Sequence, residues 1–285
     1  VADRRIPSAD DCVLRYLLER RAGETPSKTF AVFDDETTWS YAETLATVRR
    51  TAAGLQALGV GQGDLVLSWL PNGRDCLRVW FAINYLGAVY VPINLAYRGR
   101  ILEHVLANTQ AKAMIAHVDL VPRLAQIERA ALSDVLVLGG EAAPVEGLRL
   151  HEAAMLDTSG DMPAELIRPI APWDTGCVIY TSGTTGPSKG VLSSYIHMSS
   201  SLPAFSFLNE SDRYLVNLPL FHVGGTGAVY IPLALGGSIA LVESFDTRVF
   251  WETVRRLGAT TVTLLGVTSS FLMKQAPSKR DRDHT

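Results

Sequence analysis

Short apolar runs alternate with segments of helical periodicity over most of this 285-residue chain. The runs of strand length occupy residues 65–69, 88–91, 113–116, 135–138, 176–180, 190–193, 214–218, 238–242 and 260–265. Helical patterns lie between several of these runs, at about 74–86, 98–108 and 120–130 and after residues 194 and 246. Strands that alternate with helices are typical of βαβ units, so the pattern predicts an α/β fold with largely parallel sheets flanked by helices.

The N-terminal part of the chain predicts a hairpin and a capped helix. Residues 30–33 and 37–39 flank the polar turn Asp34-Asp35-Glu36, which is the pattern of an antiparallel strand pair. Ser40 is followed three positions later by Glu43, the spacing of a capping box. We therefore expect a helix to begin after Ser40, and Gly59 to end it.

Residues 141–172 are the least regular part of the chain and are rich in Ala, Gly, Pro and acidic residues. Linkers between compact units often have such a composition. We therefore expect two lobes, a first α/β lobe over residues 1–170 and a second over residues 171–285.

The stretch from Tyr214 to Val242 contains no Asp, Glu, Lys or Arg and would be long enough to cross a bilayer as one helix. Pro219, Pro232 and five glycines interrupt it. Because proline and glycine break or weaken a continuous helix, the stretch is better interpreted as buried α/β core, and we expect no integral membrane segment.

The composition, with 47% hydrophobic and 19% charged residues, is that of a soluble globular protein. The net charge of −3 gives no electrostatic reason to expect nucleic acid as a partner, so small molecules are the expected partners. Cys12, Cys76 and Cys177 lie far apart, without the spacing of metal ligands. Residues 1–7 have no apolar signal core. These features together favour a reduced, cytoplasmic setting.

The segment with the most chemical character is Tyr-Thr-Ser-Gly-Thr-Thr-Gly-Pro-Ser-Lys-Gly at residues 180–190, directly after the apolar pair Val178-Ile179. Its glycines let the main chain approach an anion, and its hydroxyls and backbone N–H groups are donors. Lys189 adds a positive charge. The segment predicts a phosphate-binding loop, and a polar turn between two strands is the alternative interpretation.

This loop differs from a Walker A sequence, which has glycine immediately before the lysine and Ser or Thr immediately after it. Here Ser188 precedes Lys189 and Gly190 follows it. The residues after Lys189 also predict a short strand, whereas a Walker loop continues directly into a helix. A P-loop NTPase is therefore disfavoured.

On this loop the chain resembles a known family, the adenylate-forming enzymes, which include acyl-CoA synthetases, aryl-CoA ligases, luciferases and the adenylation domains of peptide synthetases. The shared pattern is Tyr-Thr-Ser-Gly-Thr-Thr-Gly-x-x-Lys-Gly. The resemblance implies that the loop holds the β- and γ-phosphates of ATP while a carboxylate attacks the α-phosphate. The nucleotide-binding residues that it implies are Thr181, Ser182, Gly183, Thr184, Thr185, Gly186 and Lys189, with Thr181 also contacting Mg²⁺.

A second segment of interest is Pro-Leu-Phe-His-Val-Gly-Gly at residues 219–225. A single histidine in an apolar stretch is usually a hydrogen-bonded core residue, and that interpretation stays open for His222. The resemblance instead places His222 at the mouth of an acyl pocket, where it would position the reacting carboxylate; an ionised carboxylate needs no general base. Gly224 and Gly225 would give the substrate close access to the backbone, although tight helix packing explains them equally well. Gly266 would leave room beside the pocket, which residues 262–271 would line.

The same segment distinguishes between branches of the family. Domains that activate amino acids carry Phe-Asp where this chain has Phe221-His222, and their aspartate pairs with the α-ammonium group of the substrate. A buried ammonium without a counter-charge is costly, so a plain carboxylic acid is the expected substrate. The last part of the chain, residues 248–284, looks most like crotonobetaine/carnitine-CoA ligases and related ATP-dependent acyl-CoA ligases.

The resemblance covers the whole chain, which is roughly half as long as a typical member of the family. Several later features of the family are not found in this sequence: the Gly-Gly-Ala-Pro, Tyr-Gly-x-Thr-Glu and Thr-Gly-Asp segments and the C-terminal domain. We therefore expect a truncated N-terminal part of the large domain of an acyl-CoA synthetase whose substrates are a carboxylic acid, ATP and CoA. A homodimer is a candidate assembly. One loop cannot supply all the positioned charge that the reaction needs, so the chain alone is expected to be inactive. A non-catalytic module that binds nucleotide or acyl groups is the alternative.

Overall fold

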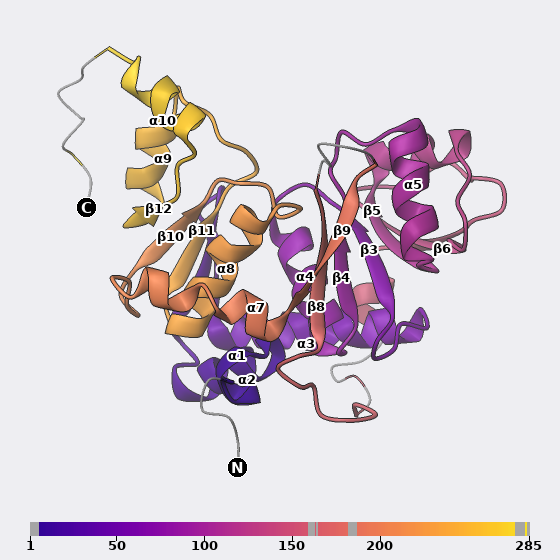
Figure 1. Cartoon of the computed structure of the whole chain (residues 1–285), viewed down its shortest axis with the longest axis horizontal. Helices are drawn as coiled ribbons and strands as arrows, with labels where there is room; N and C mark the ends of the chain where they lie inside the picture. The colour runs from indigo at the N-terminus through magenta and orange to yellow at the C-terminus, as the bar shows by residue number, and fades with distance from the viewer. Residues whose placement is uncertain (1–5, 159–162, 164, 182–186, 277–282, 284–285) are drawn as a thin grey trace.

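The structure is a computed structural model that describes residues 6–158, 163, 165–181, 187–276 and 283. These residues form two β-sheets and three layers of helices, in the order α–β–α–β–α (Figure 1). One hydrophobic core fills the space between the sheets, and two others lie on their outer faces. The predicted α/β class with flanking helices is confirmed.

The seven-stranded sheet has the order β7-β6-β5-β3-β4-β8-β9. Its strands are β3 (Leu65–Trp69), β4 (Val89–Pro92), β5 (Ala113–His117), β6 (Asp134–Leu138), β7 (Arg149–Glu152), β8 (Thr175–Thr181) and β9 (Lys189–Ser194). All neighbouring pairs are parallel except β8 and β9, which are antiparallel. Strand β8 alternates between two cores, with Cys177 and Ile179 facing one and Val178 and Tyr180 the other. A strand buried on both faces explains the continuous apolar run in its sequence.

The five-stranded sheet has the order β12-β10-β11-β1-β2. Its strands are β1 (Thr29–Phe33), β2 (Thr38–Ser40), β10 (Arg213–Val216), β11 (Ser238–Leu241) and β12 (Thr261–Val262). The hairpin predicted on either side of Asp34-Asp35-Glu36 is present as the antiparallel pair β1–β2, and the other pairs are parallel. The predicted strand 260–265 shortens to two paired residues.

The two sheets do not divide the chain at one position. Strands β1 and β2 pair with strands that follow residue 212, and β8 and β9 pair with strands that precede residue 153. The predicted boundary at residue 170 therefore coincides with no boundary between the sheets, because composition reports where the chain is loosely structured and carries no information about which strands pair. The predicted loose segment also contains β7 and the short helix α6.

The helices are α1 (Ala9–Cys12), α2 (Leu14–Glu24), α3 (Tyr41–Ala57), α4 (Arg74–Tyr85), α5 (Gly99–Thr109), α6 (Met155–Thr158), α7 (Tyr195–Ser199), α8 (Val223–Leu235), α9 (Phe250–Arg256) and α10 (Gly266–Met273), with 3₁₀ turns η1 (Val118–Gln126) and η2 (Leu202–Phe205). Helices α2, α3, α4 and α8 lie between the sheets. Helix α5 and η1 cover the outer face of the seven-stranded sheet, and α9 and α10 cover that of the other (Figure 1).

The local sequence signals explain where α3 begins and ends. The Ser40 hydroxyl accepts from the Glu43 N–H at 3.2 Å, and the Glu43 carboxylate accepts from the Ser40 N–H at 2.7 Å, which is the predicted capping box. Beyond the helix, Gly59 has a φ of +95°, which glycine adopts without steric cost.

One helical prediction needs correction, and the uncharged stretch is α/β core as predicted. The α-helix expected at 120–130 is a 3₁₀ turn, because Pro122 has no N–H to continue an α-helical ladder. Within the uncharged stretch, α8 forms despite Pro232, which lies in its last turn, and Gly236 ends it at a φ of +79°. None of the helices among the described residues is long and apolar enough to cross a membrane.

Candidate functional site

The β8–β9 hairpin brings the two ends of the predicted phosphate-binding loop together. Thr181 at the end of β8 pairs directly with Lys189 at the start of β9, and both side chains are exposed. No carboxylate of the described residues forms an ion pair with Lys189. The strand after the lysine confirms the distinction from a Walker loop. The predicted ligands Ser182, Gly183, Thr184, Thr185 and Gly186 lie outside the described residues.

Helix α5 holds both flanks of this hairpin. His104 Nε2 lies 2.7 Å from the backbone oxygen of Ser188, and because a carbonyl can only accept, Nε2 carries the proton. One turn later, Asn108 Nδ2 donates to the Tyr180 hydroxyl at 2.8 Å. Burial raises the pKa of Tyr180, so this hydroxyl stays neutral. The two contacts fix the hairpin at Tyr180, near the end of β8, and at Ser188, directly before β9.

His222 is the N-cap of α8 and is exposed. Its Nδ1 accepts from the Gly224 N–H at 3.2 Å, and its carbonyl accepts from Gly225 and Thr226. The core-histidine interpretation is therefore wrong, because the side chain lies at the surface. In the neutral imidazole the proton is on Nε2, which remains available as a donor.

The chain that leads to His222 is held by Asn72. Its Nδ2 donates to the Leu218 carbonyl at 3.0 Å, and its Oδ1 accepts from the Leu220 N–H at 2.8 Å. A Cβ on Gly225 would lie 2.1 Å from the backbone oxygen of Pro219. Of the two explanations offered for this glycine, the structure supports tight packing of the helix N-terminus against the preceding turn.

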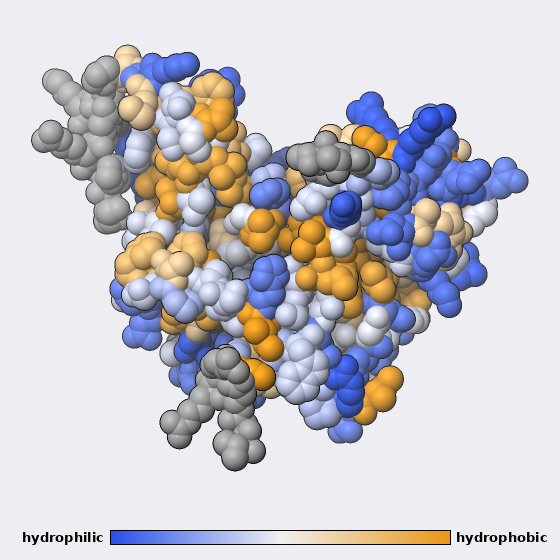
Figure 2. Space-filling view, viewed as in Figure 1, coloured by the Kyte–Doolittle hydropathy of each residue, from blue (hydrophilic) through white to orange (hydrophobic). Residues whose placement is uncertain are grey.

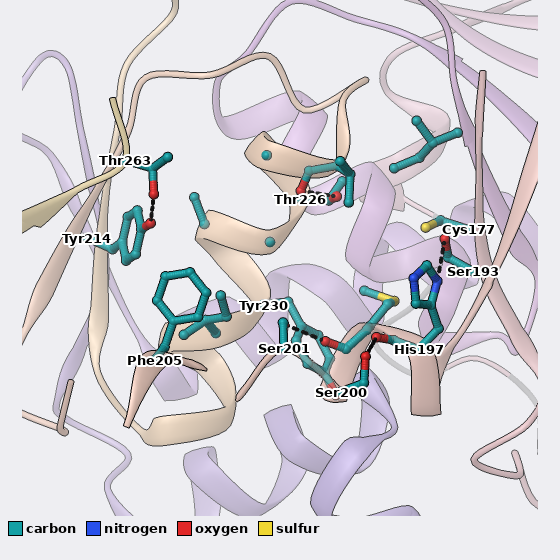
Figure 3. Close-up of a pocket in the computed structure, with 17 residues that line it drawn as sticks. Cys177, Ser193, His197, Ser200, Ser201, Phe205, Tyr214, Thr226, Tyr230 and Thr263 are labelled. Atoms are coloured by element: carbon teal, nitrogen blue, oxygen red, sulfur yellow. Dashed lines mark hydrogen bonds between the residues drawn. The ribbon is translucent and has the colours of Figure 1, made fainter. Parts of the chain in front are cut away.

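A cavity of about 330 Å³ lies between the two sheets, beside α8 (Figure 3). It is lined by Cys177, Ile179 and Ser193 from β8 and β9; by His197, Met198, Ser200, Ser201 and Phe205 from the segment around α7 and η2; by Val223, Gly224, Thr226, Gly227, Ala228, Tyr230 and Ile231 from α8; and by Tyr214 and Thr263. Sites for small molecules are typically concave, mostly apolar and of 300–1,000 Å³.

The polar side chains of the cavity form hydrogen bonds with one another or with backbone carbonyls (Figure 3). His197 Nδ1 lies 3.2 Å from the Ser193 hydroxyl, and the Tyr214 hydroxyl bonds to Thr263 on the opposite side. Burial raises the pKa of the Cys177 thiol to about 12, so this group is neutral. The cavity can therefore take an apolar group with a few hydroxyls nearby.

The surface of the molecule is indented between the part that carries α9 and α10 and the part that carries α5 (Figure 2). Hydrophobic residues gather below the indentation, near the start of α8 and over β9. Val191, Leu192 and Val223 are exposed there. This face connects the predicted phosphate-binding hairpin with the beginning of the helix that lines the cavity.

Of the predicted substrate residues, Gly224 lines the cavity, His222 precedes the lining residue Val223, and Gly225 is buried in helix packing. Gly266 begins α10 and does not line the cavity. Sequence reasoning missed most of the wall. A signal was available, because Val223, Thr226, Gly227, Tyr230 and Ile231 follow the i, i+3, i+4, i+7, i+8 spacing of one helix face.

A metal centre built from protein side chains is not seen in this part of the molecule. Within the described residues no group of three or more His, Cys, Asp and Glu side chains could hold an ion. Mg²⁺ in nucleotide sites is often held by one or two protein oxygens together with the phosphates of the substrate. The exposed hydroxyl of Thr181 is compatible with that kind of contact.

Comparison with known proteins gives the family. The sequence model of the AMP-binding enzyme family matches residues 18–284. The chain belongs to this family. Curated relatives of this AMP-binding chain include crotonobetaine/carnitine–CoA ligases from Salmonella arizonae, 28% identical over 284 residues, and Citrobacter koseri, 30% identical over 283 residues. Each alignment covers 95% of this chain and 54% of the relative, so the chain spans about half the length of the curated relatives it matches.

Solved structures of similar fold agree with the AMP-binding assignment. A Rhodopseudomonas palustris protein assigned as a long-chain-fatty-acid CoA ligase superposes with a TM-score of 0.80 at 23% identity, covering 95% of this chain and 67% of the other. The anthranilate CoA ligase AuaEII, solved with anthranoyl-AMP, gives a TM-score of 0.76 at 23% identity, covering 87% and 49%. At these identities the likeness establishes the fold of the AMP-binding domain.

Proposed function

We propose that this chain supplies the phosphate-binding and acyl-binding parts of an AMP-forming acyl-CoA ligase. A carboxylate oxygen attacks the α-phosphorus of ATP, the bond to the bridging oxygen breaks, and pyrophosphate leaves. The thiolate of CoA then attacks the acyl carbon, and AMP leaves with its phosphate oxygen. Strand β8 is the observation that supports this most directly, because it ends in Thr181 at the phosphate-binding hairpin and contributes Cys177 and Ile179 to the cavity.

The proposed roles follow from position. Lys189 and the loop residues 182–186 would bind the phosphates of ATP, with Thr181 also contacting Mg²⁺, which would neutralise charge on the phosphates. His222, exposed at the N-terminus of α8, would orient the carboxylate through its Nε2–H. Gly224 lies in the cavity wall and would contact the acyl group through its backbone, since a Cβ there would point toward Leu218. We assign Gly266 no contact with this cavity.

The acid is proposed to be a plain carboxylic acid. An α-amino acid would need a counter-charge for its ammonium group, and none of the described residues that line the cavity is Asp or Glu. ATP, Mg²⁺ and CoA complete the proposed set of ligands, in a protein proposed to be cytoplasmic and to bind no nucleic acid, with a homodimer as its candidate assembly.

The deciding experiment is acid-dependent exchange of labelled pyrophosphate into ATP, measured on the polypeptide that carries this chain. Exchange that requires a carboxylic acid is the expected result, and its absence with every class of acid would refute the ligase function. We propose that the 285 residues alone do not complete the reaction, because one loop supplies only part of the positioned charge. Calorimetry on these 285 residues tests the alternative, a binding module, which predicts tight and saturable binding of ATP without exchange.

A further inference from the structure

Building on the proposed function, we infer that Asn72 is a positioning residue for His222. Asn72 sets the place of this histidine, and through it the carboxylate of the acid, relative to the phosphate-binding hairpin. The inference concerns the carboxyl ends of the two sheets, which carry the two halves of the proposed site (Figure 1). Asn72 acts through the histidine and not on the ligands themselves.

The proposed site is divided between the sheets. Thr181 is the last residue of β8 in the seven-stranded sheet, and the phosphate-binding hairpin begins there. His222 follows β10, a strand of the five-stranded sheet, after residues 217–221. Reacting atoms must come within about 3–3.5 Å of each other, and a misplacement of about 1 Å can cost about a hundredfold in rate. The two sheets must therefore be held at a fixed separation where these residues lie.

The Asn72 side chain joins the two sheets at this end. It lies in the loop between β3, a strand of the seven-stranded sheet, and α4. Its Nδ2 donates to the carbonyls of Leu218 at 3.0 Å and Val242 at 3.4 Å, and its Oδ1 accepts from the Leu220 N–H at 2.8 Å. Carbonyl oxygens only accept and a backbone N–H only donates, so these partners fix the orientation of the amide. One side chain from the β3–α4 loop thus holds the chain at the ends of β10 and β11.

These bonds reach His222 through a short turn. Asn72 holds the chain on both sides of Pro219, and the Pro219 carbonyl accepts from the His222 N–H at 3.0 Å. Leu220, two positions before the histidine, is anchored in the core with 1% of its surface exposed. The His222 carbonyl in turn accepts from the Gly225 N–H, where α8 begins. Loss of the Asn72 amide would therefore free the turn that carries the histidine.

The same loop makes a second contact with the five-stranded sheet. Arg74 bonds to the Asp35 carboxylate and the Thr37 hydroxyl at the β1–β2 hairpin, and its guanidinium lies 4.8 Å from the centre of the Phe33 ring. This ion pair is exposed, and exposed pairs contribute little to stability. It also lies away from the chain that leads to His222. Asn72 therefore provides the contact that matters for the histidine.

A change from amide to acid tests the role with little change in size. Asn72→Asp keeps an oxygen to accept from the Leu220 N–H but replaces the donor with an oxygen that faces two carbonyls. Gln62→Glu is the matched control, since Gln62 forms the same kind of amide bridge before the other end of β3. Its Nε2 donates to the Arg168 carbonyl at 3.0 Å, and its Oε1 accepts from the Arg168 N–H at 3.2 Å.

Pyrophosphate exchange is measured with the polypeptide that carries this chain. We expect Asn72→Asp to lower kcat by about tenfold or more and to leave the KM for ATP within about twofold, because α5 holds the phosphate-binding hairpin. Gln62→Glu should leave both constants within about twofold of the unaltered polypeptide.

A double-variant cycle tests whether Asn72 acts through the histidine. In a His222→Ala background, Asn72→Asp should lower kcat by less than about twofold further, because no imidazole remains to be positioned. The same loss in both backgrounds would show that Asn72 acts independently of His222 and would overturn the inference.

Amide hydrogen exchange on the 285-residue chain tests the positioning without any activity. The N–H groups of Gly225 and Thr226, which donate to the His222 carbonyl, should exchange faster in Asn72→Asp and at the unaltered rate in Gln62→Glu. Unchanged hydrogen exchange in Asn72→Asp would overturn the inference and leave the ligase function intact. Absence of acid-dependent pyrophosphate exchange in the unaltered polypeptide would refute the ligase function, and hydrogen exchange would still decide the positioning. Urea unfolding checks that each variant is folded, and Asn72→Ala, which adds no charge, takes the place of an unfolded Asn72→Asp.

Discussion

Replacing Gly225 with alanine tests how the N-terminus of α8 is packed. An added Cβ would lie 2.1 Å from the Pro219 carbonyl oxygen, 2.5 Å from its carbon and 2.8 Å from the Leu218 oxygen. These are backbone atoms, and Asn72 hydrogen-bonds the backbone on both sides of Pro219, so the turn cannot relax cheaply. Overpacking of this kind costs about 1–3 kcal/mol. Alanine's higher helix propensity returns up to about 1 kcal/mol.

We therefore expect Gly225→Ala to lower the free energy of unfolding by about 1–2 kcal/mol, which corresponds to a melting temperature lower by roughly 2–6 °C. Gly227→Ala is the matched control, since a Cβ there meets no heavy atom within 4 Å and the residue lies in the same helix. That variant should be neutral or slightly stabilised. Urea and thermal unfolding followed by circular dichroism measure both. Equal stability of the two variants would show that Gly225 is not required for packing.

Three other outcomes are expected. His104→Leu removes the donor to the Ser188 carbonyl and should raise the KM for ATP roughly fivefold in pyrophosphate exchange with little change in kcat, whereas His104→Gln keeps an N–H and should restore most of the affinity. Asp134, which accepts two bonds from Arg149, has a pKa held well below its usual value by that guanidinium. The stability that this carboxylate contributes is present above the unfolded pKa near 4 and is lost as the pH falls from there toward the lower folded pKa. Asp134→Asn should therefore cost about 1–2 kcal/mol in urea unfolding at pH 7 and less at pH 3, since solvent around the largely exposed Arg149 screens the pair. Burial raises the pKa of the Cys177 thiol from 9.0 to about 12, which lowers its thiolate population about a thousandfold. Thiol reagents should therefore modify Cys177 at neutral pH only after urea unfolds the chain. Rapid labelling of Cys177 in the native protein would contradict its burial.

Local signals predicted the elements whose causes are local. The capping box of Ser40 and Glu43 and the polar turn after Phe33 each act within a few residues, and both features are present. The strand at residues 65–69 is also found at its predicted bounds, because an apolar run between turn residues has few other interpretations.

Long-range pairing is what the sequence pattern could not predict. The alternation of strands and helices predicts parallel sheets, but it does not say that β1 joins β11 or that β8 joins β4. The predicted boundary at residue 170 followed from composition alone. Which strand pairs with which depends on the free energy of burying whole faces, and this is not encoded in any short segment.

The candidate site shows the same division. The loop at residues 180–190 was recognisable because its residue types act locally on an anion, and its flanking strands are confirmed. The wall of the cavity was mostly missed, since Tyr214, Phe205 and α8 come together only through the packing of two sheets. The positioning roles of His104 and Asn72 were also missed, because each acts on a segment more than 80 residues away.

The pairing of β1 with β11 has a consequence for synthesis of the protein. Ala31 lies opposite Ile239, so β1 gains this parallel neighbour only after some 200 further residues have left the ribosome. Strands β3 to β7, by contrast, find all their mutual partners before residue 153. Contacts so distant in sequence form slowly, and nascent chains fold from the N-terminal side as they emerge. The seven-stranded sheet therefore begins to form first, while the edge of β1 that later pairs with β11 stays unpaired and open to a chaperone.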